Sequence, residues 1–289
     1  MPCGIIIVDK PEGWTSQDVA AKLRGVFHER RVGHGGTLDP MATGVLPIFM
    51  GRATRAVEFF ESAEKEYVAG LRLGLVTNTQ DSTGEVLEEK PVTVTRGELE
   101  AVLQQFLGKQ QQIPPMYSAV KIGGKKLYEL ARQGKTVERK PRDIEILELE
   151  LLEGEGAEYR IRVRCSKGTY VRTLCHDIGA ALGCGGCMSS LRRTKAGCYD
   201  LGKSVTMDAL LSHENPETLL LPVDSLFAHL PMHTVGEKQL KYVYNGAAVK
   251  ASIPEGFYRV YAPDGAFLMV GRAKDGMLHT EKSFFEVKE

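Results

Sequence analysis

Residues 32–48, VGHGGTLDPMATGVLPI, place a single carboxylate inside an unusual stretch of backbone. The twelve residues from Gly33 to Gly44 include four glycines and one proline, and Asp39 stands among them, directly before Pro40. Glycine adopts conformations that other residues avoid and proline fixes φ, so we predict a long structured loop that presents Asp39. An Asx turn before Pro40, in which Asp39 only shapes the bend, is the structural alternative.

Periodic patterns on both sides of this loop predict an α+β domain. Apolar runs predict strands at about 4–8, 66–75 and 186–201. Helical spacing of apolar residues predicts helices at about 16–27, 51–63, 96–107 and 170–182. Thr15 with Ser16, the capping box Thr95-Arg-Gly-Glu98, and Thr169 are the expected N-terminal caps of three of these helices.

Residues 143–165 predict a hairpin with charged faces. Ile144 and Ile146 alternate with glutamates before the phase shifts by one residue, which indicates a β-bulge. The second strand carries Arg160, Arg162 and Arg164, which could hold phosphates. Because the opposite strand is rich in glutamate, we favour cross-strand charge pairing for these arginines.

The C-terminal part of the chain predicts a separate module. Short strand patterns with turn signals at Asn245-Gly246 and Asp264-Gly265 follow a proline-punctuated stretch. We therefore divide the chain into a domain at 1–230 and a small all-β module at 231–289. The expected fold class is α+β, with a mixed, largely antiparallel sheet core and flanking helices.

Charge is balanced overall, with 37 basic and 37 acidic side chains, but it is segregated along the sequence. Segment 109–142 has nine Lys and Arg against two Glu, whereas segment 143–159 has seven acidic residues and no basic one. This pattern permits a basic face on a neutral molecule. The apolar start meets Asp9 at once, and no apolar run approaches the roughly 18 residues of a membrane span, so we expect a cytoplasmic protein without a membrane partner.

Six blocks resemble, in order, the signature motifs of the TruB family of tRNA pseudouridine synthases. They are DKPEGWTS (9–16), GHGGTLDPMATGVLPI (33–48), EYVAGLRLG (66–74), IPPMYSAVKIGGKKLYELARQG (113–134), SKGTYVRTLCHDIG (166–179) and LRR (191–193). The resemblance covers about residues 4–200, and the tail resembles the small RNA-binding PUA-type module of that family. It implies conversion of a uridine in the T-loop of tRNA, at position 55, to pseudouridine without a cofactor or metal.

The resemblance also implies roles for single residues. Asp39 would be the nucleophile, Tyr67 would stack on the flipped uracil and assist proton transfer, and Arg172 would pair with Asp39. The implied substrate-binding residues are His34, Tyr170, Leu191 and Lys10. The carboxylate could attack C1′ of the sugar, attack C6 of the base, or abstract a sugar proton, and the residues leave these three routes open.

Segment 109–142 corresponds to the mobile insertion with which that family clamps RNA. Its Lys121, Lys125, Lys126 and Arg132 are then candidate phosphate contacts, with a solvated helix face as the alternative. The expected partner is the T-arm of tRNA, bound by a monomer without an obligate protein partner.

Two other functions fit parts of the sequence. A non-catalytic RNA-binding protein or tRNA-folding chaperone would need the basic segment but not Asp39, Tyr67 and Arg172 together. A zinc protein would use Cys184 and Cys187, which have the spacing of half a metal site. We favour free thiols, because no second pair completes that site.

Overall fold

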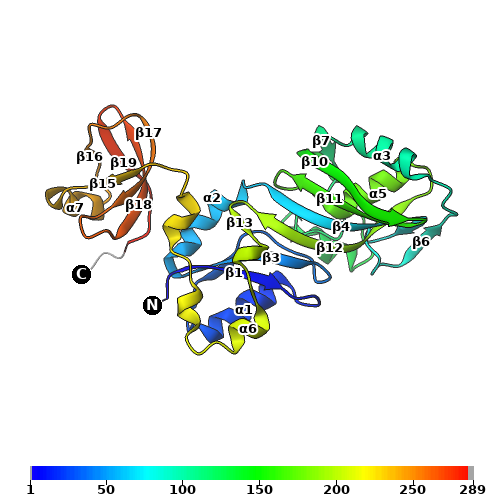
Figure 1. The fold of residues 1–289 in the computed structure, drawn as a ribbon, viewed down its shortest axis with the longest axis horizontal. Coiled ribbons are helices and arrows are strands. Elements are labelled where there is room, and N and C mark those ends of the chain that lie inside the picture. Colours follow the sequence, from blue (N-terminus) through cyan, green and yellow to red (C-terminus); the bar gives the residue numbers. More distant parts are fainter. Residues whose placement is uncertain (1, 286–289) are drawn as a thin grey trace.

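A ten-stranded mixed sheet forms the centre of the molecule in the computed structural model, which describes residues 2–285 (Figure 1). Along the sheet lie β14 (Val205–Thr206), β1 (Gly4–Lys10), β3 (Thr43–Met50), β12 (Gly186–Ala196), β4 (Lys65–Leu73), β11 (Glu158–Cys165), β10 (Arg142–Glu155) and β7 (Gly108–Gln112). Further, β2 (Val32–His34) pairs with β3, and β13 (Tyr199–Asp200) with β12. The pairs β1–β14 and β3–β12 are parallel and the others antiparallel, which confirms the predicted fold class.

Both faces of this sheet are covered at β1 and β3. In β1, Ile6 and Val8 belong to one buried cluster while Ile5 and Ile7 belong to another. Side chains alternate between the two faces of a strand, so a run of four apolar residues is buried on both sides. The first cluster includes residues of α1 (Ser16–Val26), α3 (Arg96–Gln105) and α5 (Val171–Ala181). The second includes residues of the 3-10 helix η1 (Gly51–Ala56) and of α2 (Val57–Glu61).

Two of the three predicted helix caps are confirmed. Thr15 accepts from the backbone N–H of Asp18 at the start of α1, and Thr95 does the same with Glu98 at the start of α3. The third prediction is wrong, because Tyr170 is the N-cap of α5 and Thr169 instead donates its hydroxyl to the Ser166 carbonyl. The backbone N–H of Tyr170 finds its partner in the side chain of Gln112, at 2.8 Å.

The prediction of one long loop over residues 32–48 is wrong at both ends. Strand β2 occupies its beginning and β3 its end, so the irregular part is residues 35–42. The run from Gly44 to Met50 is buried throughout, as expected of a strand with apolar neighbours on both faces. Its glycine and proline content hid this strand from the sequence analysis, because both residues are unfavourable inside strands.

The hairpin formed by β10 and β11 has the predicted charge pairs and bulge. Arg160, Arg162 and Arg164 bond at 2.6 Å to Glu153, Glu150 and Glu148, respectively. The register shifts between Ile146 and Glu148, where the bulge was predicted. These arginines are therefore held by glutamates of the neighbouring strand.

A second sheet of five strands lies at the C-terminal end of the chain (Figure 1). It contains β15 (Met232–Thr234), β17 (Gly256–Tyr261), β18 (Phe267–Lys274), β19 (Met277–Ser283) and β16 (Val249–Lys250), in that order. The module is consistent with a PUA-like fold but is not purely β, because α7 (Glu237–Tyr244) precedes Asn245-Gly246. That pair ends a helix and does not turn a hairpin.

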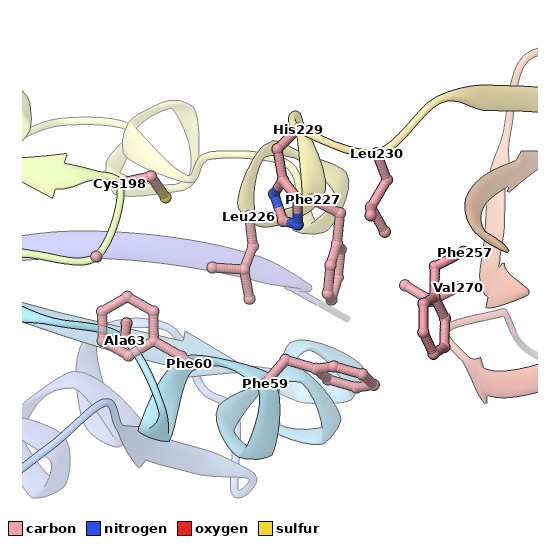
Figure 2. A pocket seen from close by; sticks show the side chains of 11 residues that line it. Phe59, Phe60, Ala63, Cys198, Leu226, Phe227, His229, Leu230, Phe257 and Val270 are labelled. Carbon is pink, nitrogen blue, oxygen red and sulfur yellow. The ribbon is translucent and has the colours of Figure 1, made fainter. Parts of the chain in front are cut away.

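Aromatic side chains join this sheet to the rest of the molecule. Phe227 contacts Phe59 on α2 as well as Phe267 and Phe284, with ring centroids 5.3–6.3 Å apart. A cavity of about 310 Å³ beside them is lined from both sides, by Phe59 and Leu226 and by Phe257 and Val270 (Figure 2).

The predicted boundary at residue 230 remains a proposal. Among the residues described, no helix is long and apolar enough to cross a bilayer.

Candidate active site

Asp39 lies in the irregular segment between β2 and β3, and neighbouring elements hold its backbone on both sides. Ser16, at the start of α1, accepts from the Leu38 N–H at 2.8 Å and donates to the Leu38 carbonyl at 3.2 Å. On the other side, Lys10 Nζ donates to the Pro40 carbonyl at 3.2 Å. The Asp39 carboxylate is 34 % exposed, so it is open to a ligand while its backbone is fixed.

Arg172, in the first turn of α5, binds this carboxylate through two guanidinium nitrogens. Its Nε lies 2.9 Å from Oδ2 of Asp39, and its Nη2 lies 3.3 Å from Oδ1. The guanidinium also donates to the carbonyls of Thr79 at 3.1 Å and Tyr117 at 2.8 Å. Since the side chain is only 6 % exposed, these partners fix it in place, and the fork geometry suits a carboxylate.

A second carboxylate, Asp81, stands on the other side of Arg172. Its Oδ2 lies 3.7 Å from Nη1 of Arg172, and its Oδ1 accepts from the hydroxyls of Thr79 and Thr83. The sequence analysis missed this residue. The segment TNTQDSTG (77–84) has the composition of a turn, and the carboxylate does bond locally as in an Asx turn. Nothing in that pattern reveals an arginine that lies 91 positions further along the chain.

The pKa of Asp39 reflects opposed influences. Burial raises the pKa of this carboxyl above its usual value, and the charge of Asp81 acts in the same direction. The charges of Arg172 and, more weakly, Lys10 lower it. Arg172 is thus the main group that favours an ionised Asp39.

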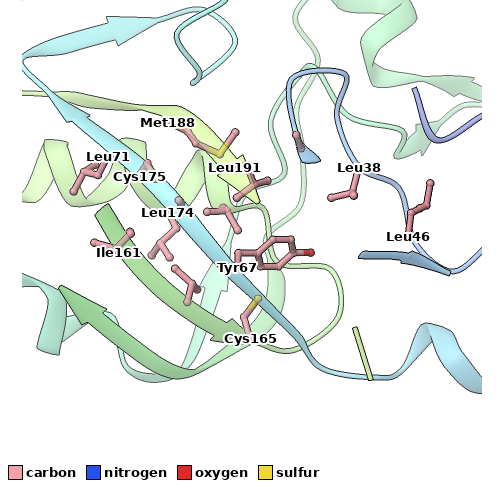
Figure 3. Close-up of a cluster of buried hydrophobic side chains, with 14 of the residues drawn as sticks. Leu38, Leu46, Tyr67, Leu71, Ile161, Cys165, Leu174, Cys175, Met188 and Leu191 are labelled. Atoms are coloured by element: carbon pink, nitrogen blue, oxygen red, sulfur yellow. The ribbon is translucent and has the colours of Figure 1, made fainter. Parts of the chain in front are cut away.

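Tyr67 projects from β4 toward the Asp39 segment. Its ring lies among buried side chains that include Leu191, and its hydroxyl points toward the segment that carries Leu38 (Figure 3). Burial raises the pKa of the phenol, so the hydroxyl is the favoured form. Leu191, on the adjacent strand β12, pairs with Ala69 of β4 and is also buried.

The remaining predicted residues surround this centre at different depths. Lys10 is fully buried, and burial lowers its pKa to about 8. His34 is partly buried, burial lowers its pKa, and its Nδ1 has no hydrogen-bond partner in the described residues. Tyr170 is partly exposed at the start of α5, two residues before Arg172.

The basic segment 109–142 begins at β7 and reaches the candidate active site. It contains a two-stranded hairpin, β8 (Lys121–Ile122) with β9 (Lys125–Lys126), and the short helix α4 (Leu127–Ala131). Lys126 and Arg132 both lie over the ring of Tyr128, whereas Lys121 and Lys125 are exposed. Because the Tyr117 carbonyl of this segment binds Arg172, the segment contacts the catalytic candidates directly.

Cys184 and Cys187 lie at the end of α5 and in β12. Both thiols are buried, and burial raises the pKa of Cys187 to about 11, which disfavours the thiolate that a metal requires. In residues 2–285, no three His, Cys, Asp or Glu side chains are grouped so as to hold a metal ion.

Comparison with known proteins identifies relatives over almost the whole chain. Residues 24–171 match the TruB family pseudouridylate synthase N-terminal domain, and residues 172–228 match the tRNA pseudouridylate synthase B C-terminal domain. The chain is 46 % identical to tRNA pseudouridine synthase B of Stutzerimonas stutzeri, over 95 % of this chain and 93 % of that protein. It is 44 % identical to the protein of the same name in Syntrophomonas wolfei, over 94 % of each.

Solved structures give the same picture of the fold. A structure described as a Cbf5-Nop10-Gar1 complex superposes with a TM-score of 0.75 and 29 % identity, covering 98 % of this chain and 85 % of its counterpart. A second, described as an H/ACA RNP bound to a substrate RNA containing 2′-deoxyuridine, gives 0.74 and 26 %, covering 99 % and 86 %. The similarity therefore extends through the C-terminal sheet.

Proposed function

The chain belongs to the TruB family and is a tRNA pseudouridine synthase, an isomerase, and from this premise we propose that it modifies the T-loop uridine at position 55 with Asp39 as the nucleophile. The role of Asp39 is supported by the contacts of its carboxylate with two nitrogens of Arg172, at 2.9 and 3.3 Å. A carboxylate that is accessible and yet held in one orientation is suited to attack a bound base or sugar.

The reaction rearranges bonds within one nucleotide. The C1′–N1 bond breaks, the uracil turns, and a C1′–C5 bond forms, while N1 gains a proton and C5 loses one. Atoms and electrons balance without a co-reactant. We propose that Asp39 assists the bond-breaking step and that the three routes named above remain alternatives for how it does so.

The target base must leave the stacked RNA loop before it reaches Asp39. Enzymes that act on a base inside a stack flip it into a pocket and hold it against an aromatic ring. Tyr67 offers such a ring beside the Asp39 segment, and we assign it this stacking role together with Leu191. His34 and Tyr170 complete the proposed pocket wall, and the buried Lys10 supports the Asp39 segment through its bond to the Pro40 carbonyl.

Binding of the T-arm is assigned to the basic segment 109–142. Its exposed Lys121 and Lys125 are the best placed to reach phosphates, because Lys126 and Arg132 already lie over Tyr128. We propose that the enzyme acts as a monomer without an obligate protein partner.

A tRNA-folding chaperone would not need an arginine buried between two carboxylates, so this arrangement favours catalysis over RNA binding alone.

The direct test is to incubate an unmodified tRNA transcript with the purified protein and a chelator and to map pseudouridine by carbodiimide-stop sequencing. We expect one stop, at position 55. Asp39→Asn should abolish it while tRNA affinity stays within about threefold, because binding is spread over many phosphate contacts. Asp143→Asn, an exposed aspartate on β10, is the matched control and should keep full activity. Residual activity of Asp39→Asn above about one per cent would remove Asp39 from the nucleophile role.

A further inference from the structure

Arg193, on β12, is a buried arginine outside the site described so far. It is 1 % exposed, and in the described part of the chain its guanidinium donates to backbone carbonyls and not to carboxylates. Its neighbour Arg192 differs on both counts, since its side chain is 42 % exposed and forms an ion pair with Asp9 at 2.7 Å. A buried charge without a counter-ion is costly to fold, so Arg193 calls for an explanation beyond packing.

The two carbonyls that Arg193 binds lie on opposite sides of Asp39. Its Nε donates to Val45 at 2.7 Å, and its Nη2 donates to Gly36 at 3.2 Å. One guanidinium thus joins the incoming and outgoing arms of the segment that carries the nucleophile.

Two glycines of this segment, Gly44 and Gly36, lie against the same residue. Gly44 has φ of +102°, and a Cβ added to it would lie 2.2 Å from the Arg193 carbonyl oxygen. Gly36 has φ of +96°, and its added Cβ would lie 3.6 Å from Nη1 of Arg193. Both positions require a conformation that side chains with a Cβ rarely adopt. The backbone of β12 at Arg193 therefore leaves no space for a Cβ at position 44, whereas a Cβ at position 36 would be in ordinary contact with the guanidinium.

Arg193 also faces Tyr67. The two residues are register partners in the antiparallel pair β4–β12, so their side chains share one face of the sheet. The charge of Arg193 and a side-chain hydrogen bond from it lower the pKa of the Tyr67 phenol, against the larger effect of burial. The other ionisable groups that influence Tyr67 are Cys165, on β11, and Asp39 itself.

We propose that Arg193 is a positioning residue for the isomerisation, which holds the Tyr67 hydroxyl and both arms of the Asp39 segment in one fixed arrangement. It contacts neither the base nor the RNA backbone, because its side chain is enclosed. This proposal rests on the proposed roles of Asp39 and Tyr67.

A double-mutant cycle under single-turnover conditions tests this assignment. Arg193→Lys keeps a positive charge but cannot reproduce the fork that spans two carbonyls. We expect its rate constant at saturating tRNA to fall at least about 30-fold while affinity for tRNA stays within about threefold. In a Tyr67→Phe background the same change should cost several-fold less than in the wild type, because the hydroxyl that Arg193 positions is already gone while its bonds to both arms of the Asp39 segment remain. Arg192→Lys, on the same strand, is the control and should keep the wild-type rate.

Two results would overturn the proposal. Equal loss in both backgrounds would show that Arg193 does not act through Tyr67. Weaker tRNA binding with a shallower salt dependence and a normal rate at saturation would make Arg193 a phosphate contact. If Arg193→Lys does not fold, Arg193→Gln removes the buried charge and carries the same cycle. The cycle is read at whichever uridine the wild type modifies, so an error in the assigned tRNA position would not be mistaken for failure of Arg193.

Discussion

At the scale of single residues, the proposed active site is organised around one arginine between two carboxylates. Arg172 binds Asp39 through two nitrogens and approaches Asp81 at 3.7 Å. The two acids are not equivalent. Asp39 is a third exposed and raised in pKa by burial, whereas Asp81 is enclosed and hydrogen-bonded to two threonines. We infer that Asp39 reacts and that Asp81 orients Arg172.

This difference gives a prediction for pH dependence. The charge of Asp81 raises the pKa of Asp39, so Asp81→Asn should lower that pKa. Because Asp39 must be ionised to act, the acid limb of the single-turnover pH–rate profile should move to lower pH. The plateau rate should also fall, since Arg172 loses one of its anchors. An acid limb that stays in place would show that Asp39 is not the group that titrates in this profile.

At the scale of elements, the sequence predicted the strands β1, β4, β10, β11 and β12 and the helices α1, α2, α3 and α5. It did not predict β2, β3 or α7, nor how the elements meet. Capping boxes and apolar periodicity are local signals, and they located α1, α3 and the β10–β11 hairpin. The contacts of Asp81 and Arg193 join segments that lie far apart in the chain. No local pattern encodes such a contact. The contacts of Asp81 and Arg193 could therefore be identified only from the fold, which places β12 and α5 beside the Asp39 segment.

The glycine motif is the element whose role changed most. From the sequence, all of its glycines were predicted to shape a structured loop, whereas Gly44 lies at the start of a buried strand, packed on the Arg193 backbone. Its φ of +102° and the absence of space for a Cβ make this position intolerant of any side chain.

We therefore predict that Gly44→Ala lowers the free energy of unfolding by about 3 kcal/mol or more, through backbone strain and overpacking. Gly97→Ala is the control, because a Cβ at Gly97, in the first turn of α3, meets no atom within 4 Å. That change should raise stability by about 0.4–1 kcal/mol. Urea denaturation measures both. Similar effects of the two substitutions would contradict the packing account.

At the scale of the whole molecule, the net charge is zero, but the basic side chains of β11 and of segment 109–142 have different surroundings. The arginines of β11 are matched by glutamates on β10, so they contribute no free positive charge. In the described residues the β8–β9 hairpin of the basic segment 109–142 pairs with no acidic strand, and its Lys121 and Lys125 are exposed. We expect RNA to meet this segment and not the arginine-rich strand.

Salt dependence separates these two surfaces. Lys121→Gln with Lys125→Gln should weaken tRNA binding and reduce the slope of log K against log salt by about two units, with a normal rate at saturation. Arg160→Gln with Arg162→Gln removes the same charge from β11 and should leave the slope unchanged. Equal effects of the two pairs would mean that the field of the whole protein, and not contact with Lys121 and Lys125, drives binding.

We propose that the Arg172 fork keeps Asp39 ionised and aimed at the target nucleotide, and the single-turnover rate of Arg172→Lys at saturating tRNA decides between this role and an RNA contact. A lysine is a point donor and cannot bind both carboxylate oxygens as Arg172 does. We predict a rate constant at least about 100-fold lower, equivalent to about 2.7 kcal/mol, with nearly unchanged tRNA affinity. A near-normal rate combined with weaker binding and a salt slope reduced by about one unit would contradict the claim, because it would make Arg172 an RNA contact.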